Sequence, residues 1–285
     1  MGAPHRLMGV LNVTPDSFSD GGRFLDHEAA IAHGGRLAAE GADILDVGGE
    51  STRPGAEPVS VEQELARVVD VVEGLDGLGL EVQISIDTSK AAVARAALRA
   101  GATLVNDVAA LRADPDMAGV VADAGADCCL MHMLGEPRTM QREPRYDDVV
   151  SEVKAFLTER MEFAVGEGIE ERRIMLDPGI GFGKTAAHNL ELLRRLDELC
   201  ELGRPLVVGT SRKSFLGRLA PSAPGPEDRL PGTIATNVLA LERGASVFRV
   251  HDVGPVADAL AVAAATLGGR WTSPRARSRT SPTTS

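Results

Sequence analysis

Eight short apolar segments alternate with longer amphipathic segments along this chain, and that order constrains the fold more than any other feature. The short segments are rich in Val, Ile and Leu and apolar on both faces, which is typical of strands covered on both sides. They span residues 7–13, 44–47, 82–87, 103–107, 127–131, 174–177, 206–209 and 247–250. The longer segments place apolar residues at spacings of three and four, which predicts helices. They span residues 29–40, 61–73, 91–100, 117–124, 147–168, 189–199, 233–243 and 256–267.

About eight βα units in 285 residues predict a single-domain (β/α)8 TIM barrel of the α/β class rather than an open sheet. A weak internal repeat supports this interpretation, because the phrases EGADILDV, AGATLVND, AGADCCLM and RGASVFRV each join a helix end to a strand. We expect the glycine in each phrase to adopt the left-handed conformation that ends many helices. These glycines are Gly41, Gly101, Gly125 and Gly244.

The domain organisation follows from length and from the placement of breaker residues. The hydrophobic content of 44% suffices for one core of barrel size, although the length alone would also allow two domains. The one long breaker-rich stretch, 220–231, falls inside a βα unit and is predicted to be a surface insertion. We therefore expect one domain over 1–270. The polar tail, 271–285, lacks periodicity and is predicted to be disordered and without function. The alternative is that its arginines contact an acidic partner.

Composition excludes several classes of partner and site. The formal net charge of −11 argues against binding nucleic acid or an anionic membrane through the overall field. No apolar run reaches the length of a membrane span, and the run at 7–13 is too short for a secretory leader and contains Asn12. The three cysteines have no CxxC spacing, so we expect buried thiols in a reducing cytosol rather than a zinc site.

Polar side chains stand at nearly every predicted strand end, where a barrel enzyme has its active site. Buried polar groups reduce stability unless they are paired, so a purely structural barrel would not need them. The mixture of hydrogen-bond acceptors and cations suits a flat, donor-rich heterocycle and an anion in one pocket. The residues are Asn12, Asp46, Asp87, Asn106, His132, Asp177, Lys213 (just beyond its strand) and Arg249.

Several loops after these strands are more elaborate than turns require. The loops at 14–24 and 48–55 are rich in Gly, Ser and Asp and carry exposed functional residue types, which favours lids or binding loops over ordinary turns. The loop at 177–185 is not a Walker A loop, because Pro178 stands where glycine is needed, and its dinucleotide-like glycines are a weak signal.

Basic residues follow the last two predicted strands, a place where barrels frequently bind phosphate. The segment at 209–217 contains Arg212 and Lys213, and Arg249 and His251 leave the eighth strand on the same side. We expect Arg249 and His251 to bind the oxygens of one anion, with a purely structural histidine as the alternative.

Taken together, these motifs resemble the dihydropteroate synthase family. The segments MGVLNVTPDSFSDGG, GADILDVGGESTRPG, SIDTSK, LVNDV, LMHM, LDPGIGFGK, SRKSFLG and RVHDV occur in the family's order and at each expected strand end. The resemblance covers roughly residues 7 to 267. It implies a transferase of folate biosynthesis that condenses 6-hydroxymethyl-7,8-dihydropterin pyrophosphate with p-aminobenzoate, giving 7,8-dihydropteroate and pyrophosphate.

The resemblance also implies roles for individual residues. Catalytic roles fall to Asp87, Asp177, Lys213 and Arg249. The pterin would be held by Asp87, Asn106, Met131, Asp177 and Lys213. Pyrophosphate would be bound by Asn12, Arg53, Arg249 and His251, with Mg²⁺ placed by Asn12. The p-aminobenzoate site would be formed by Phe18, Thr52, Arg53, Pro54, Phe182 and Ser214, with the stem of Lys213.

The implied mechanism is a dissociative substitution at the pterin methylene, with electrostatic stabilisation of the developing cation by Asp87 and Asp177. Family members suggest a cytoplasmic homodimer formed through barrel helices away from the mouth, inhibited by sulfonamides. Asp46 and Glu50 have no implied role, and we expect them to hold the loop at 48–55. The rival functions are a pterin-dependent methyltransferase, which has no use for a pyrophosphate cage, and a catalytically silent pterin-binding paralogue.

Overall fold

The computed structural model describes residues 5–14, 23–51, 58–135, 139–220, 222–223 and 225–268, with the backbone alone described over 23–26. A single parallel sheet of eight strands runs in the order β6-β5-β4-β3-β2-β1-β8-β7. Its strands are β1 (Arg6–Asn12), β2 (Ile44–Gly48), β3 (Gln83–Asp87), β4 (Leu104–Asp107), β5 (Asp127–Met131), β6 (Ile174–Asp177), β7 (Val207–Val208) and β8 (Val247–Val250). A parallel bridge between Leu176 and Leu206 brings β6 beside β7 and nearly closes the sheet into a barrel.

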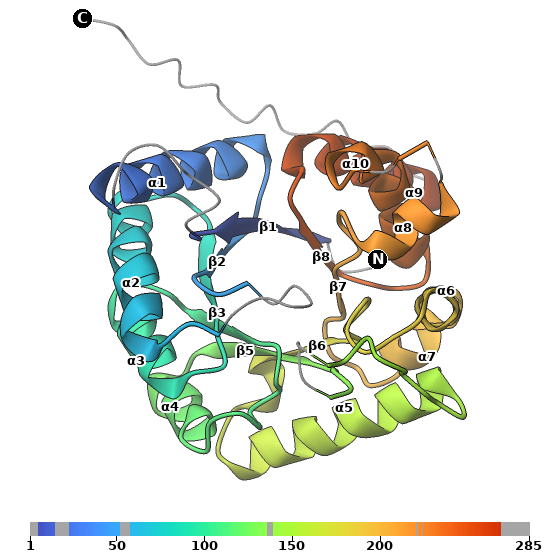
Figure 1. Cartoon of the computed structure of the whole chain (residues 1–285), viewed down its shortest axis with the longest axis horizontal. Coiled ribbons are helices and arrows are strands. Elements are labelled where there is room, and N and C mark those ends of the chain that lie inside the picture. The colour runs from blue at the N-terminus through green and yellow to red at the C-terminus, as the bar shows by residue number, and fades with distance from the viewer. Residues whose placement is uncertain are drawn as a thin grey trace, which may run out of the picture.

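Helices surround this ring of strands (Figure 1). They are α1 (Arg23–Glu40), α2 (Val61–Gly77), α3 (Ala91–Arg99), α4 (Met117–Ala124), α5 (Val149–Gly166), α6 (Ala186–Arg194), α7 (Leu196–Cys200), α8 (Ser214–Leu219), α9 (Leu230–Glu242) and α10 (Val253–Gly268). The 3-10 turns η1 (Glu171–Arg173) and η2 (Glu227–Arg229) precede β6 and α9. The predicted (β/α)8 barrel is therefore confirmed.

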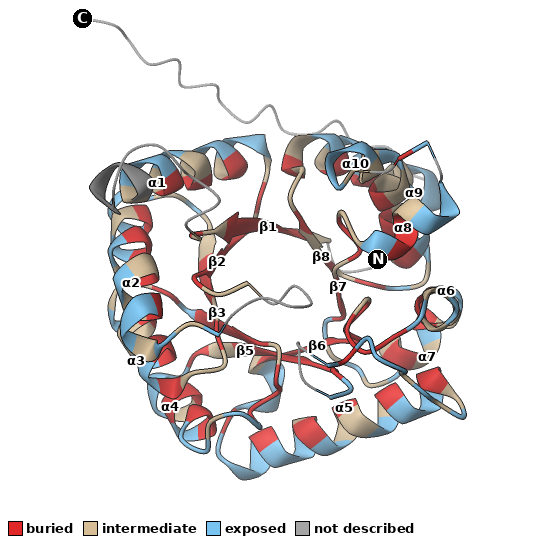
Figure 2. Cartoon of the chain, in the orientation of Figure 1, coloured by how far each residue is buried: buried red, intermediate tan, exposed pale blue. Residues whose placement is uncertain are grey.

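Two layers of apolar side chains stabilise the barrel. The larger lies between the sheet and the helices, and the inner faces of the helices are buried accordingly (Figure 2). The smaller fills the barrel interior and takes one side chain from each of seven strands: Met8, Ile44, Leu104, Cys129, Met175, Val207 and Val247. Strands covered on both faces explain why the sequence segments are apolar throughout. Within the described residues, no helix combines the length and the apolar character that crossing a membrane requires.

Local chemistry accounts for several helix boundaries. Ser60 caps α2 in a reciprocal pair with Gln63, and the Asp148 carboxylate accepts backbone N–H groups at the start of α5. The predicted left-handed glycines are confirmed; Gly41 and Gly101, for example, have φ values of 113° and 117°.

Several details of the predicted secondary structure are wrong, among them the starts of α1 at Arg23 and α10 at Val253, which lie before the predicted residues 29 and 256. The helix predicted over 189–199 is two helices, α6 and α7, because the backbone of Arg195 leaves the helical region while its side chain joins Asp148 to Glu198. The short helix α8 was predicted as loop, since six residues are too few to show a helical period. Helix α9 starts at Leu230 rather than residue 233, because proline is tolerated in the first turn of a helix.

Candidate active site

A layer of polar side chains lies directly above the apolar filling of the barrel. Because side chains of a strand alternate between two faces, the residue two positions after each interior residue also faces inward. Ile44 is thus followed by Asp46, Leu104 by Asn106 and Met175 by Asp177. Val247 is followed in the same way by Arg249, and Cys129 by Met131. Asp46, Asn106, Asp177 and Arg249 therefore gather at one end of the barrel, on a closed apolar floor. His132, directly after Met131, instead packs its ring against Phe156 of α5.

The guanidinium of Arg249 connects β8 to β2 and β3 within this layer. Its Nε donates to Oδ2 of Asp46 and its Nη2 donates to Oδ2 of Asp87, each at 2.7 Å. Burial lowers the pKa of Arg249, but the two carboxylates outweigh it and hold the pKa above the usual value. Burial raises the pKa of Asp87 to about 7 against the attraction of Arg249. Removal from water disfavours the charged carboxylate, and the nearby carboxylate of Asp46 adds to this effect, so Asp87 binds its proton tightly.

Asp46 organises the floor of the pocket, which corrects the expectation that it holds the loop after β2. Its side chain is fully buried and also accepts hydrogen bonds from Ser85 Oγ at 2.6 Å and Asn106 Nδ2 at 3.1 Å. A carboxylate only accepts hydrogen bonds, so this contact fixes the amide of Asn106 with Nδ2 toward Asp46. Sequence alone could identify Asp46 as a polar strand end but not name its partners.

Glu50 does take the expected position beside the loop after β2. Its Oε1 accepts the backbone N–H of Val59, and its Oε2 accepts from Lys90. Lys90 also pairs with the fully buried Glu64 on α2. The start and end of this loop are thereby tied to the body of the barrel.

Lys213 and Phe182 meet at the mouth of the pocket. The Nζ of Lys213 lies 4.0 Å from the centroid of the Phe182 ring, a cation–π contact. Phe182 packs in a small cluster with Met131, Met133 and Met140. The structure thus brings together two residues predicted for the pterin, Met131 and Lys213, and one predicted for p-aminobenzoate.

The electrostatics around Lys213 reflect its burial between opposite charges. Burial and the nearby Arg249 lower the pKa of Lys213 to about 8, while Asp177 and Asp87 oppose that change. Burial raises the pKa of Asp177, although the N–H of Gly179 donates to its Oδ1 at 2.6 Å and Lys213 attracts it. The pKa values of two acids, Asp87 and Asp177, and of one cation, Lys213, are therefore shifted toward neutrality.

His251 is bound to the end of β7 through Ser211, a residue that received no role from the sequence. The Oγ of Ser211 lies 3.0 Å from Nδ1 of His251 and accepts the backbone N–H of His251. Burial and the nearby Arg249 lower the pKa of His251 to about 3, so the ring is neutral at neutral pH. If the Ser211 hydroxyl donates to Nδ1, the ring carries its proton on Nε2. Arg212, beside it, is engaged by Asp252 through two hydrogen bonds.

Oxygen donors suited to Mg²⁺ border the end of β2. A Cβ built on Gly48 would lie 3.7 Å from Oδ2 of Asp87 and 3.8 Å from Oδ1 of Asn12, so both oxygens lie beside the end of β2, and Oδ2 of Asp87 also accepts from Arg249. Amide and carboxylate oxygens are ligands that this hard cation prefers. No group of three or more His, Cys, Asp or Glu side chains able to hold a metal occurs in the part of the chain that the structure describes.

The remaining predicted site residues divide into two groups. Ser214 is exposed at the first position of α8, directly after Lys213. The four others, Phe18, Thr52, Arg53 and Pro54, lie outside the described residues. The predicted insertion at 220–231 contributes one contact to the site loop, since Arg229 donates from Nη1 to the backbone oxygen of Arg212.

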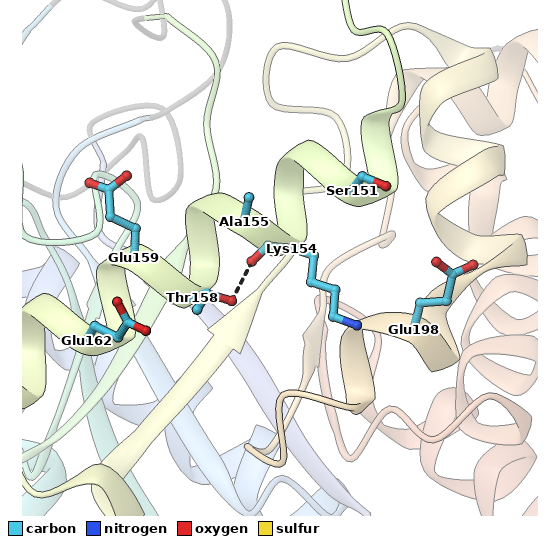
Figure 3. A pocket seen from close by; sticks show the side chains of 7 residues that line it. All are labelled: Ser151, Lys154, Ala155, Thr158, Glu159, Glu162 and Glu198. Carbon is cyan, nitrogen blue, oxygen red and sulfur yellow. Dashed lines mark hydrogen bonds between the residues drawn. The ribbon is translucent and has the colours of Figure 1, made fainter.

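A shallow depression also lies on the outer surface, away from the strand ends (Figure 3). It has a volume of about 590 Å³ and is lined by residues of α5 with Glu198 of α7. Lys154 lies at its centre and forms a solvent-exposed ion pair with Glu201. None of its lining side chains is buried, and none comes from a strand end. It therefore has no part in the site at the barrel mouth.

Comparisons with known proteins agree with this geometry. The model of the pterin binding enzyme family matches residues 8–251. The curated dihydropteroate synthase of Mycobacterium leprae is 49% identical, covering 93% of this chain and 94% of that protein. That of Escherichia coli strain K12 is 47% identical, covering 94% of this chain and 93% of that protein.

Solved structures are equally similar. Xanthomonas albilineans dihydropteroate synthase with 4-aminobenzoic acid is 51% identical with a TM-score of 0.86, covering 92% of this chain and 93% of that one. The Yersinia pestis enzyme in a sulfonamide drug complex is 45% identical with a TM-score of 0.87, covering 93% and 95%. The resemblance found in the sequence motifs is confirmed: this chain belongs to the pterin binding enzyme family and, within it, to the dihydropteroate synthases.

Proposed function

We propose that this chain condenses 6-hydroxymethyl-7,8-dihydropterin pyrophosphate with p-aminobenzoate at the barrel mouth, forming 7,8-dihydropteroate and pyrophosphate in folate biosynthesis. The observation that carries the proposal is the polar layer of Asp87, Asn106, Asp177 and Arg249 on a closed apolar floor. Its carboxylates accept hydrogen bonds from the amino-pyrimidine edge of the pterin, and the fixed amide of Asn106 presents its oxygen to the same ring. Met131 packs against the ring face.

The reaction is a dissociative substitution at the pterin methylene. As the bond to pyrophosphate breaks, positive charge develops on the pterin, where the carboxylates of Asp87 and Asp177 stabilise it. Arg249 has five N–H donors, of which two serve Asp46 and Asp87, and the others face the departing pyrophosphate. His251 adds a neutral N–H donor set by Ser211. The neutral aromatic amine of p-aminobenzoate then attacks the methylene, and the new C–N bond is left neutral as the nitrogen releases one proton to the departed pyrophosphate.

The oxygen ligands present at this site are of the type that Mg²⁺ prefers. Asn12 would hold it through its side-chain oxygen, with pyrophosphate supplying further oxygen ligands, as is usual for this cation. Bound there, Mg²⁺ supplies charge neutralisation for the leaving group.

The p-aminobenzoate side of the pocket is formed by Phe182 and Ser214 with the stem of Lys213. The cation–π contact between Lys213 and Phe182 supports this assignment, because it creates an apolar wall beside a cation that can attract the benzoate carboxylate. Phe18, Thr52, Arg53 and Pro54 complete this side from the two long loops, and Arg53 also reaches the pyrophosphate.

The enzyme works as a cytoplasmic homodimer assembled through barrel helices away from the mouth. Exposed apolar side chains on the paired helices α9 and α10, such as Leu239 and Val262, support this assembly. The free cysteine thiols fit a reducing compartment. Light scattering coupled to gel filtration tests the dimer directly.

The deciding experiment measures dihydropteroate formation from the pterin pyrophosphate and p-aminobenzoate, with and without Mg²⁺. We expect product that depends on both substrates and on the metal. Binding of the pterin without turnover would instead identify a silent paralogue, and methyl transfer from methyltetrahydrofolate would identify the methyltransferase. Loss of Mg²⁺ dependence alone would overturn the metal assignment and leave the reaction standing.

A further inference from the structure

Lys184 is a buried lysine of the loop between β6 and α6, and the reaction proposed above does not use it. Only 2% of its surface is exposed. Its Nζ lies 2.8 Å from Nδ1 of His132, 3.0 Å from the backbone oxygen of Phe182 and 3.4 Å from that of His132. An ammonium group has three N–H donors, and these are three acceptors. The ammonium is thus fully satisfied without water.

His132 is the matching acceptor at the end of β5. Burial and the nearby Lys184 lower the pKa of His132 to about 3, so its ring is neutral and can accept at Nδ1. The ring is fixed by an edge-on contact with Phe156, whose centroid lies 4.8 Å away. Burial lowers the pKa of Lys184 to about 7, while Asp177 opposes the change. The pair therefore sets the Lys184 nitrogen, as the donor, against a rigid neutral base.

The loop that carries Lys184 packs closely against the end of β5. A Cβ on Gly179 would lie 1.9 Å from the backbone oxygen of His132, and one on Gly183 would lie 2.5 Å from that of Leu134. Only glycine allows such an approach, particularly at the positive φ values of these two residues. Gln141 and Tyr146 add hydrogen bonds to the backbone oxygens of this loop. The loop is built to hold one position relative to β5.

We propose that Lys184 is a positioning residue for the p-aminobenzoate side of the pocket. Its ammonium ties the loop at 178–184 to the carboxyl end of β5, and the bond to the Phe182 oxygen fixes the ring that lies under Lys213. Met131, the last residue of β5, packs in the same apolar cluster as that ring. The role assigned to Phe182 rests on the proposed function, whereas the tie itself does not.

Replacing Lys184 by Met keeps the length of the side chain and removes its donors. We expect Lys184→Met to raise the KM for p-aminobenzoate by about 10-fold or more with kcat within about threefold, because a displaced wall costs substrate orientation. Hydrogen exchange followed by mass spectrometry in the free protein should be faster in the peptide that covers 178–184. Lys154→Met, on the outer surface, is the matched control and should change neither quantity.

Variants of His132 test the same contact from its acceptor side. His132→Asn retains an acceptor near the position of Nδ1 and should keep the KM within about threefold of wild type, whereas His132→Leu should raise it as Lys184→Met does. The double variant Lys184→Met with His132→Leu should be no worse than Lys184→Met alone, because without the ammonium the ring of His132 has no hydrogen bond to lose in this tie. Should Lys184→Met fail to fold, the Asn and Leu variants of His132 decide the question by the same two measurements.

The outcomes separate this proposal from the reaction itself. A wild-type KM and unchanged exchange in Lys184→Met would overturn the positioning role while leaving the proposed function intact. Lower stability with a wild-type KM in the folded fraction would show a purely structural lysine and also overturn it. A wild-type enzyme that forms no dihydropteroate would refute the function, and the exchange rates would still test the tie.

Discussion

The Nη2 of Arg249 donates to Oδ2 of Asp87 at 2.7 Å, joining a residue proposed for pyrophosphate to one proposed for the pterin. The two halves of the pocket are therefore coupled before any substrate is bound. Asp46 completes this coupling by accepting from Nε of the same guanidinium. The cation that receives the leaving group is thus held in place by two carboxylates, Asp46 and Asp87.

Replacement of Arg249 by Lys should reduce kcat/KM by about 100-fold, because a single ammonium cannot bridge two carboxylates and still present a planar pair of donors to an anion. Steady-state kinetics with pterin pyrophosphate at saturating p-aminobenzoate would measure the change. Arg212→Lys is the control, since that guanidinium is engaged by Asp252. Equal losses in the two variants would argue against a specific role for Arg249.

Asp46→Asn should lower the free energy of unfolding by about 3 kcal/mol, because it leaves a buried guanidinium with one carboxylate fewer. It should also weaken pterin binding, since the amide of Asn106 loses its fixed orientation. Ser85→Ala removes only one neutral donor to Asp46 and should cost about 1 kcal/mol. Urea denaturation and titration with a pterin measure both effects. Similar values for the two variants would contradict the central role of Asp46.

Asp177→Asn tests the stabilisation of the developing cation. We expect kcat/KM to fall by about 100-fold, because a neutral amide replaces a carboxylate that faces the charge of the transition state. The measurement is the initial rate of dihydropteroate formation at limiting pterin pyrophosphate. A value within a few-fold of wild type would remove Asp177 from the mechanism.

His132 makes stability depend on pH in a defined window. Its pKa is lowered from 6.5 to about 3 by burial, so the unfolded chain binds one more proton than the folded protein between those values. Its contribution to stability is complete above pH 6.5 and is lost as the pH falls. His132→Asn does not titrate, and between pH 4 and 6 its unfolding free energy should vary by about 1.4 kcal/mol per pH unit less than that of wild type. Urea midpoints across this range test the slope; identical slopes would mean that the histidine titrates normally.

Sulfonamides should inhibit the enzyme in competition with p-aminobenzoate. The segment STRPG of the loop after β2 and Phe18 are both present in the sequence, and the related Yersinia pestis enzyme has been solved in a sulfonamide drug complex. Inhibition should weaken as p-aminobenzoate rises, with the maximal rate unchanged. Full activity at high sulfonamide and low p-aminobenzoate would contradict this expectation.

The sequence determined the architecture and the chemical inventory of this protein. Strand periods, helix periods and glycine punctuation are local signals, so they predicted eight βα units and placed polar residues at the strand ends. These local signals fail where an element is too short to show a period or where its boundary depends on side chains from elsewhere in the chain. They missed α8, which is six residues long, and the break at Arg195, which depends on side chains from two other segments.

Only the tertiary structure decided which of those polar residues bind one another. Asp46 and Arg249 are 203 positions apart, and Lys184 and His132 are 52 apart, so no spacing in the chain relates either pair. Their contacts arise because closing the barrel brings distant strands around one axis and buries their side chains together. In that setting an unpaired charge is costly, and Arg249 and Lys184 are both found with their acceptors. The sequence was enough to predict which polar residues lie at the strand ends, and closure of the barrel determined which of them form hydrogen bonds with one another.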